Sequence, residues 1–125
     1  METPGKRLRK LINAPEILVL PGVFDGFSTR LVDQAGYTAA FITGSGISES
    51  RLGQADVGIM GLEENVAGAR AIAGCTSMAL LADGDTGYGN AINAWHTVKA
   101  FERAHFERLG AERIRDHTAV HLIYR

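Results

Sequence analysis

The sequence predicts an α/β domain organised on a parallel β-sheet, and three observations support this fold class. Short apolar runs that end at glycine, proline or aspartate alternate with longer stretches of helical periodicity. The run at residues 78–82 is apolar at every position, as in strands that are buried on both faces of a parallel sheet. The order is a helix, then strand and helix alternating three times, then a strand, which is the order of repeated right-handed βαβ units.

Three elements are expected in the first 35 residues: a helix over 6–13, a strand over 16–20 and a helix over 25–35. The first helix has leucine and isoleucine at helical spacing with basic residues between them, and a proline follows it. The strand is a mostly apolar stretch that ends at Pro21. Asp25 is suited to cap the second helix and Gly36 to end it in the left-handed conformation, with Phe27 and Leu31 on one face.

The elements that follow are a strand over 38–43, a polar loop over 47–61, a helix over 62–73, a strand over 78–82, a helix over 91–109 and a strand over 119–124. The polar loop is longer than a minimal connection, and such loops inside a compact unit are usually functional. Glu63 and Glu64 fall in the first turn of their helix, where the helix dipole favours acidic side chains. Trp95 is expected in the core or an interface, and Cys75 is expected as a small buried residue.

Composition and charge exclude several classes of protein. With 13 basic and 14 acidic residues, the chain lacks the positive charge that nucleic-acid-binding domains carry, so we expect no nucleic-acid partner. Its apolar runs are too short to cross a bilayer, so we expect no membrane partner and a cytoplasmic location. The single cysteine excludes an intramolecular disulfide and a cysteine cluster for zinc.

The strand over 78–82 runs into Asp83-Gly84-Asp85-Thr86-Gly87-Tyr88-Gly89-Asn90, which we call the acidic loop. In parallel α/β folds the loops at the carboxyl ends of the strands bind ligands. Two carboxylates two residues apart suit Mg²⁺, which takes one or two carboxylate oxygens and keeps several water molecules. The same residue types occur in ordinary turns, so the residues alone support a metal site and a plain turn equally.

The strand over 38–43 ends at the same edge of the sheet, in a turn of small residues over 43–46. The backbone N–H groups of such a turn can bind a carboxylate or a phosphate, but the residues alone favour a plain loop. Asp56 lies in the polar loop, and its position alone indicates only a solvated acid.

Four segments resemble the successive signatures of the isocitrate lyase and phosphoenolpyruvate mutase superfamily, in the same order and at similar spacing. They are residues 20–25 (Leu-Pro-Gly-Val-Phe-Asp), 41–46 (Phe-Ile-Thr-Gly-Ser-Gly), 54–58 (Gln-Ala-Asp-Val-Gly) and the acidic loop. The resemblance covers residues 15–104 and is most specific in the acidic loop. It is greatest to the short bacterial members, such as methylisocitrate lyase, oxaloacetate decarboxylase, dimethylmalate lyase and carboxyphosphonoenolpyruvate mutase.

The resemblance implies a reaction that depends on Mg²⁺, or alternatively Mn²⁺, and acts on a small 2-oxo or 2-hydroxy carboxylate through an enolpyruvate-like intermediate. Asp83 and Asp85 would hold the metal, directly or through water, and Asp56 corresponds to the family's loop aspartate near the metal. The implied substrate-binding residues are Phe41, Thr43, Gly44, Ser45 and Asp56. A metal bound to a 2-oxo acid stabilises the enolate oxygen that develops as a carbon–carbon bond breaks.

Three functions remain open for such a chain. The first is a carbon–carbon lyase or decarboxylase, and the second is a phosphonomutase of the same fold. The third is a non-catalytic remnant that binds a metal or a partner subunit. The resemblance does not separate the first two, because the segment that distinguishes them has no counterpart in this sequence.

The chain departs from the family's pattern in two places. The family usually has Asp-Ala-Asp where this chain has glycine at position 84, a change that loosens the turn. After Ala104 the family continues with a strand ending in Glu-Asp and a mobile Lys-Cys-Gly-His loop, which carries the catalytic cysteine of the lyases. Neither motif occurs here, and Cys75 does not replace that cysteine, so no catalytic residue is assigned.

The implied architecture is a partial (β/α)8 TIM barrel, roughly the first three to four βα units after an N-terminal helix. The 125 residues are far fewer than the roughly 250 of a complete barrel. We expect one partial-barrel domain over 1–125, made of an N-terminal helix over 1–14, family-like units over 15–104 and a divergent tail over 105–125. Both sheet edges and part of the apolar surface would be open, so we expect impaired activity and a homo-oligomer.

Overall fold

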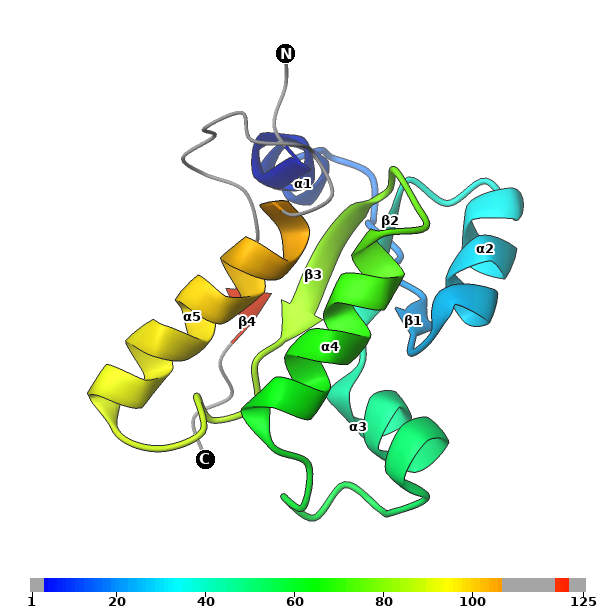
Figure 1. Cartoon of the computed structure of the whole chain (residues 1–125). Coiled ribbons are helices and arrows are strands. Elements are labelled where there is room, and N and C mark those ends of the chain that lie inside the picture. Colours follow the sequence, from blue (N-terminus) through cyan, green and yellow to red (C-terminus); the bar gives the residue numbers. More distant parts are fainter. Residues whose placement is uncertain (1–3, 107–118, 122–125) are drawn as a thin grey trace.

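The computed structural model describes residues 4–106 and 119–121 and shows an α/β fold on a four-stranded parallel sheet (Figure 1). The sheet order β1-β2-β3-β4 follows the chain, and each neighbouring pair is parallel. The strands are β1 (Gly22–Val23), β2 (Ala39–Ile42), β3 (Ala79–Asp83) and β4 (Ala119–His121). The helices are α1 (Pro4–Ile12), α2 (Gly26–Gln34), α3 (Gly44–Ile47), the π-helix η1 (Ser48–Leu52), α4 (Leu62–Ala73) and α5 (Ala91–Phe106). The predicted α/β class with a parallel sheet is confirmed.

Two apolar clusters lie on opposite faces of the sheet, because successive strand residues point to opposite sides. The larger cluster packs the sheet against α4 and α5, which cover one face (Figure 1). It includes Val23, Ala40, Ile42, Leu80 and Ala82 from the strands and Val66, Ala69, Ile72 and Phe101 from the helices. The smaller cluster joins Leu8 of α1 to Ala39 and Ala79 on the other face. Strand β3 is therefore covered on both faces, as its uniformly apolar sequence predicts, with Leu81 half-buried on the α1 side.

The first strand begins later than the sequence predicts. Residues 16–20 pair with no strand of the described sheet, and Ile17 is 90% exposed. Hydrogen bonding to β2 starts at Pro21, whose carbonyl accepts from the Phe41 N–H at 2.9 Å. The expected strand over 16–20 is wrong, because Pro21 precedes the paired residues and does not end them. A proline is tolerated at a sheet edge, since the N–H that it lacks has no partner strand on the outer side.

Helix α2 begins at a reciprocal cap. The Asp25 carboxylate accepts from the Ser28 N–H at 2.7 Å, and the Ser28 hydroxyl accepts from the Asp25 N–H at 3.2 Å. Hydrogen bonds from Ser28 to the carboxylate lower the pKa of Asp25. Gly36 follows the helix with φ of +87°, in the left-handed region. The expected start and end of this helix are confirmed.

Some large apolar side chains are more exposed than their pattern suggests. The Phe27 side of α2 faces solvent, with Phe27 73% exposed, because α2 lies at the β1 edge of the sheet (Figure 1). Trp95 of α5 is 63% exposed, so the expected place in the core is wrong and the place in an interface stays a prediction. Cys75 is half-buried, and its thiol donates to the Ile72 carbonyl at 3.2 Å. Helical periodicity identifies an apolar face, but it does not show whether a neighbour covers that face.

The polar loop expected over 47–61 starts as helix. Residues 44–52 form α3 and η1, and only residues 53–61 lack helical structure. Thr43 caps α3 by accepting from the Gly46 N–H at 3.3 Å, and Ile47 is buried against α4, where Gly68 leaves room for it. Burial of Ile47 outweighs the low helix propensity of the surrounding glycine and serine residues.

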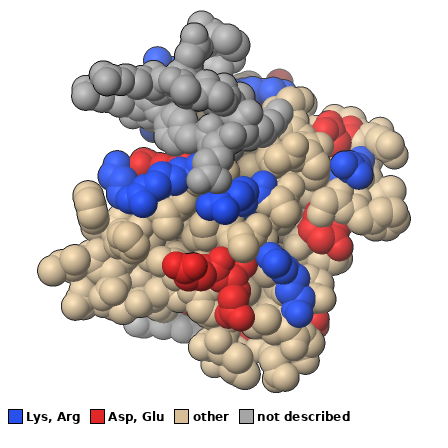
Figure 2. Space-filling model, in the orientation of Figure 1, with Lys and Arg blue, Asp and Glu red and all other residues tan. Residues whose placement is uncertain are grey.

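The last part of the chain is described in pieces. Helix α5 is confirmed to Phe106, and its expected end at 107–109 lies outside the described residues. Strand β4 is confirmed over 119–121, and the expected residues 122–124 also lie outside. None of the helices in the described ranges has the length and apolar character needed to span a bilayer. Acidic and basic side chains are interspersed on the face shown in Figure 2, in keeping with a net charge of -1.

Candidate functional site

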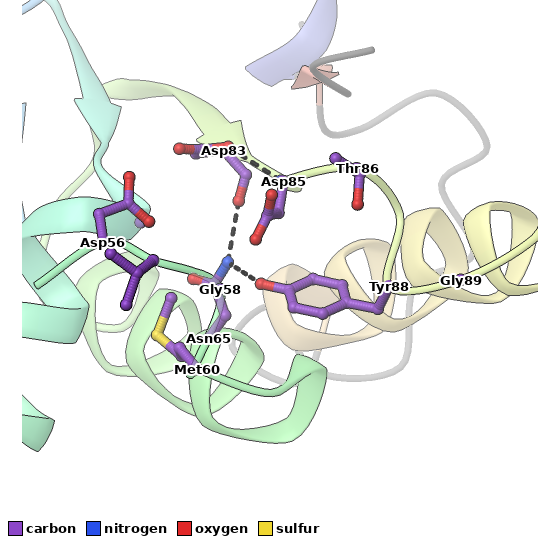
Figure 3. A pocket seen from close by; sticks show the side chains of 11 residues that line it. Asp56, Gly58, Met60, Asn65, Asp83, Asp85, Thr86, Tyr88 and Gly89 are labelled. Carbon is purple, nitrogen blue, oxygen red and sulfur yellow. Dashed lines mark hydrogen bonds between the residues drawn. The ribbon is translucent and has the colours of Figure 1, made fainter. Parts of the chain in front are cut away.

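A cavity of about 550 Å³ lies at the carboxyl ends of β2 and β3 (Figure 3). The lining residues include Gly44, Asp56, Asn65, Asp83, Asp85 and Tyr88. They come from the first turn of α3 directly after β2, the loop before α4, helix α4 itself and the acidic loop. This is the edge of a parallel sheet where side chains from different loops converge.

The acidic loop holds the Asp83 carboxylate by a hydrogen bond from its own backbone. Asp83 is the last residue of β3, and its Oδ1 accepts from the Asp85 N–H at 2.9 Å. Asp85 has φ of +53°, in the left-handed region that aspartate tolerates better than most residues. Both side chains line the cavity and both are half-buried. The structure therefore brings the two predicted metal ligands to one place.

The turn after β2 approaches the Asp83 carboxylate closely. A Cβ on Gly44 would lie 3.1 Å from Asp83 Oδ2, so glycine lets the backbone pass beside this oxygen. The sequence predicted that these two segments meet at one edge of the sheet, and they do. Thr43 caps α3 through its hydroxyl, while Phe41 and Ser45 are half-buried. Of the five predicted substrate-binding residues, Gly44 and Asp56 line the cavity, and Phe41, Thr43 and Ser45 do not.

Asp56 faces the acidic loop from the other side of the cavity. It is exposed and lies in the segment between η1 and α4 (Figure 3). Within residues 4–106 and 119–121, no group of three His, Cys, Asp or Glu side chains is close enough to enclose a metal. The pair Asp83 and Asp85 nevertheless suits Mg²⁺, which binds through one or two carboxylates and fills its other positions with water or ligand oxygens.

Asn65 is the residue of the site that sequence reasoning missed. Its side chain is fully buried, and its Nδ2 donates to the Asp83 carbonyl at 3.0 Å and to the Tyr88 hydroxyl at 2.8 Å (Figure 3). Its Oδ1 is buried and has no hydrogen-bond partner in the described structure. The sequence signal that could have identified it is an asparagine on the apolar face of α4, next to Val66. A polar group at such a position needs partners, because burying it without them is costly.

Tyr88 completes the wall of the cavity in an unusual backbone conformation. Its φ is +58°, which a tyrosine rarely adopts and which a surrounding structure must enforce. The hydroxyl of buried Thr97 supports this part of the loop by donating to the Gly87 carbonyl at 2.9 Å. Burial raises the pKa of Tyr88 to about 12. The hydrogen bond from Asn65 opposes this shift, and the negative charges of the three cavity aspartates add to it. The phenol is therefore neutral at physiological pH.

Comparison with known proteins agrees with this geometry. Residues 8–112 match the family described as phosphoenolpyruvate phosphomutase. The 2,3-dimethylmalate lyase of Eubacterium barkeri is 39% identical over 104 residues, which are 83% of this chain and 36% of that enzyme. The chloroplastic carboxyvinyl-carboxyphosphonate phosphorylmutase of Arabidopsis thaliana is 40% identical over 94 residues, 74% of this chain and 28% of that enzyme. The chain thus spans about a third of the length of these relatives.

Solved structures show the same fold with related ligands. Oxaloacetate acetylhydrolase in complex with its product oxalate has a TM-score of 0.77 and 39% identity, over 82% of this chain and 37% of that one. Phosphonopyruvate hydrolase in complex with oxalate and Mg²⁺ has a TM-score of 0.76 and 29% identity, over 82% of this chain and 36% of that one. The family match and these identities confirm the resemblance seen in the sequence: the chain belongs to the PEP mutase/isocitrate lyase superfamily, and its relatives there are lyases and mutases.

Proposed function

We propose that the cavity binds Mg²⁺ through Asp83 and Asp85, with a small 2-oxo or 2-hydroxy carboxylate beside it. One observation carries this proposal: three aspartates and Gly44 line a single cavity at the carboxyl edge of the sheet, in a chain of this superfamily. The reaction class that fits best is that of a carbon–carbon lyase or decarboxylase. Mn²⁺ is the alternative metal, because it also prefers oxygen ligands.

Each residue of the site has a separate proposed role. The bond from the Asp85 N–H holds Asp83 Oδ1, so the carboxylate keeps one orientation and its Oδ2 is free for a ligand. Asp56 adds a third negative charge at the rim of the cavity. Phe41, near the end of β2, and Thr43 and Ser45, on either side of Gly44, are proposed to bind the substrate. When bound, the metal would supply Lewis-acid stabilisation of an enolate oxygen.

The parallel sheet also supports a proposal for the architecture. We infer that its four strands are the first strands of a (β/α)8 barrel, because relatives with the same fold are about three times as long. The sequential order β1 to β4 is the order that strands have around such a barrel.

Calorimetric titration of Mg²⁺ and oxalate tests the proposed site. The variants to compare are wild type, Asp83→Ala and Glu16→Ala, which removes an exposed carboxylate outside the cavity. We expect saturable binding in wild type and Glu16→Ala and its loss in Asp83→Ala. Folded wild-type protein, checked by circular dichroism, that binds neither Mg²⁺ nor oxalate would contradict the proposal.

A phosphonomutase reaction is the second candidate, because the Arabidopsis relative is named as a phosphorylmutase and is 40% identical to this chain. The two candidates differ in the bond that changes. Phosphorus-31 NMR with phosphonopyruvate follows the phosphorus–carbon bond, whereas release of a 2-oxo acid from a dialkylmalate follows the carbon–carbon bond. Turnover in the second assay and not in the first supports the lyase proposal.

A further inference from the structure

Asn65 and Tyr88 connect helix α4 to the acidic loop at the wall of the cavity (Figure 3). Both hydrogens of the Asn65 amide are used, one on the Asp83 carbonyl and one on the Tyr88 hydroxyl oxygen. Because Asn65 is fully buried, water does not compete for these bonds. The phenol oxygen is therefore held at a fixed place relative to the strand end that carries the Asp83 carboxylate.

The hydrogen bond from Asn65 determines which hydrogen-bonding group of the Tyr88 hydroxyl remains available to a ligand. A tyrosine hydroxyl has one hydrogen to donate and lone pairs with which it accepts. Tyr88 accepts from Asn65, so a lone pair is used and the hydrogen is not. Within the described residues, this is the hydroxyl's one hydrogen bond, and Tyr88 lines the cavity. The hydrogen is available to a molecule in the cavity.

The charges of the cavity limit what can bind an anion there. Its described lining includes three aspartates and neither lysine nor arginine. An anionic ligand therefore depends on a metal and on neutral donors for its stabilisation. The Tyr88 hydroxyl is such a donor.

We propose that the Tyr88 hydroxyl donates a hydrogen bond to an anionic oxygen of the bound carboxylate, and that Asn65 is the positioning residue that aims it. This inference rests on the proposed function, because the ligand is the carboxylate assigned to the same cavity. The raised pKa of Tyr88 supports it, since a phenol that stays protonated keeps its hydrogen. Tyr88 and Asn65 thereby add a carboxylate subsite to the metal pair.

Tyr88→Phe tests the donor, because it removes one oxygen and leaves the ring in place. Mg²⁺ is titrated first, and oxalate is then titrated into the Mg²⁺-saturated protein. We expect unchanged Mg²⁺ affinity and roughly 10-fold weaker oxalate binding, the loss typical of a hydrogen bond to a charged group. Tyr37→Phe is the matched control, because it removes the same atom from an exposed tyrosine outside the cavity. It should change neither affinity.

Two results would overturn the donor role. Oxalate binding by Tyr88→Phe at wild-type affinity shows that the ligand does not use the hydroxyl, while the proposed function stands. Equal losses of Mg²⁺ and oxalate affinity show that Tyr88 only shapes the loop. Absence of oxalate binding in wild type instead contradicts the proposed function itself, so the two failures are distinguishable.

A double-mutant cycle tests the positioning role of Asn65. Asn65→Leu, which keeps the side-chain volume and removes the donor, should weaken oxalate binding about as much as Tyr88→Phe does. The double variant should lose no more than Asn65→Leu alone, because both changes remove the same contact. Additive losses would show that Asn65 acts independently of Tyr88.

Discussion

Gly44→Ala tests whether the close approach between the turn after β2 and the Asp83 carboxylate is needed for metal binding. The added Cβ would lie 3.1 Å from Asp83 Oδ2 and 3.4 Å from Asp83 Cγ. Unstrained contacts begin at about 3.5 Å, so the carboxylate must move by roughly 0.4 Å. Its Oδ1 is held by the Asp85 N–H at 2.9 Å, so this movement strains that bond.

The expected effect is larger on metal binding than on folding. Metal–ligand distances tolerate only about 0.2 Å, and disturbing the surroundings of a ligand typically weakens metal affinity by about 10-fold or more. Gly44 is helical, a conformation that alanine favours, so the loss of unfolding free energy should stay below about 1 kcal/mol. We therefore expect Mg²⁺ affinity to fall about 10-fold in Gly44→Ala with a nearly unchanged melting temperature.

Calorimetric titration of Mg²⁺ and thermal unfolding measure the two effects. Gly26→Ala is the control, because its added Cβ would make an ordinary 3.8 Å contact with Cys75 Sγ, away from the cavity. The control should bind Mg²⁺ like wild type. Equal Mg²⁺ affinity in Gly44→Ala and wild type would refute the argument that the glycine is required beside Asp83.

Two further predictions concern pH. Absorbance titration of tyrosinate should show one of the three tyrosines ionising near pH 12, and Tyr88→Phe should remove that component. The folded pKa of Tyr88 lies above its unfolded value, so its contribution to stability is complete below about pH 10 and is lost as the pH rises toward 12. For the α2 cap, Asp25→Ala should cost about 1 kcal/mol in urea unfolding at neutral pH. Because the folded pKa of Asp25 is lowered, this contribution is present above about pH 4 and disappears as the pH falls through the folded pKa; an unchanged acid limb in Asp25→Ala would contradict it.

Elements whose limits depend on neighbours in the sequence were predicted well. Helix α2 starts at the Asp25 cap, and α4 spans residues 62–73 as its periodicity indicates. Elements whose limits depend on distant partners were not. Strand β1 is defined by bonds to β2, beginning at the Pro21 carbonyl, and α3 forms because Ile47 is buried. Neither bond nor burial is visible in the local residue pattern.

In the site, too, residues marked by their sequence neighbours were predicted, and a residue that depends on distant contacts was not. Asp83 and Asp85 were identified because they end an apolar strand, and Gly44 because its turn ends the neighbouring strand. Asn65 was not identified, because its importance comes from contacts across 18 residues to Asp83 and 23 residues to Tyr88. Those contacts exist only when α4 packs beside the end of β3. The substrate roles of the turn residues and the metal site itself stay predictions.

The backbone of the acidic loop has a consequence for the kinetics of ligand binding. Positive φ occurs at Asp85, Gly87, Tyr88 and Gly89, and such values are rare for aspartate and tyrosine in a free chain. The entropy cost of reaching this shape is therefore met during folding, when Thr97 and Asn65 anchor the loop. A ligand that arrives at the folded protein finds a loop already in place. Association should then follow a single exponential whose rate rises linearly with ligand concentration, without a plateau set by loop rearrangement.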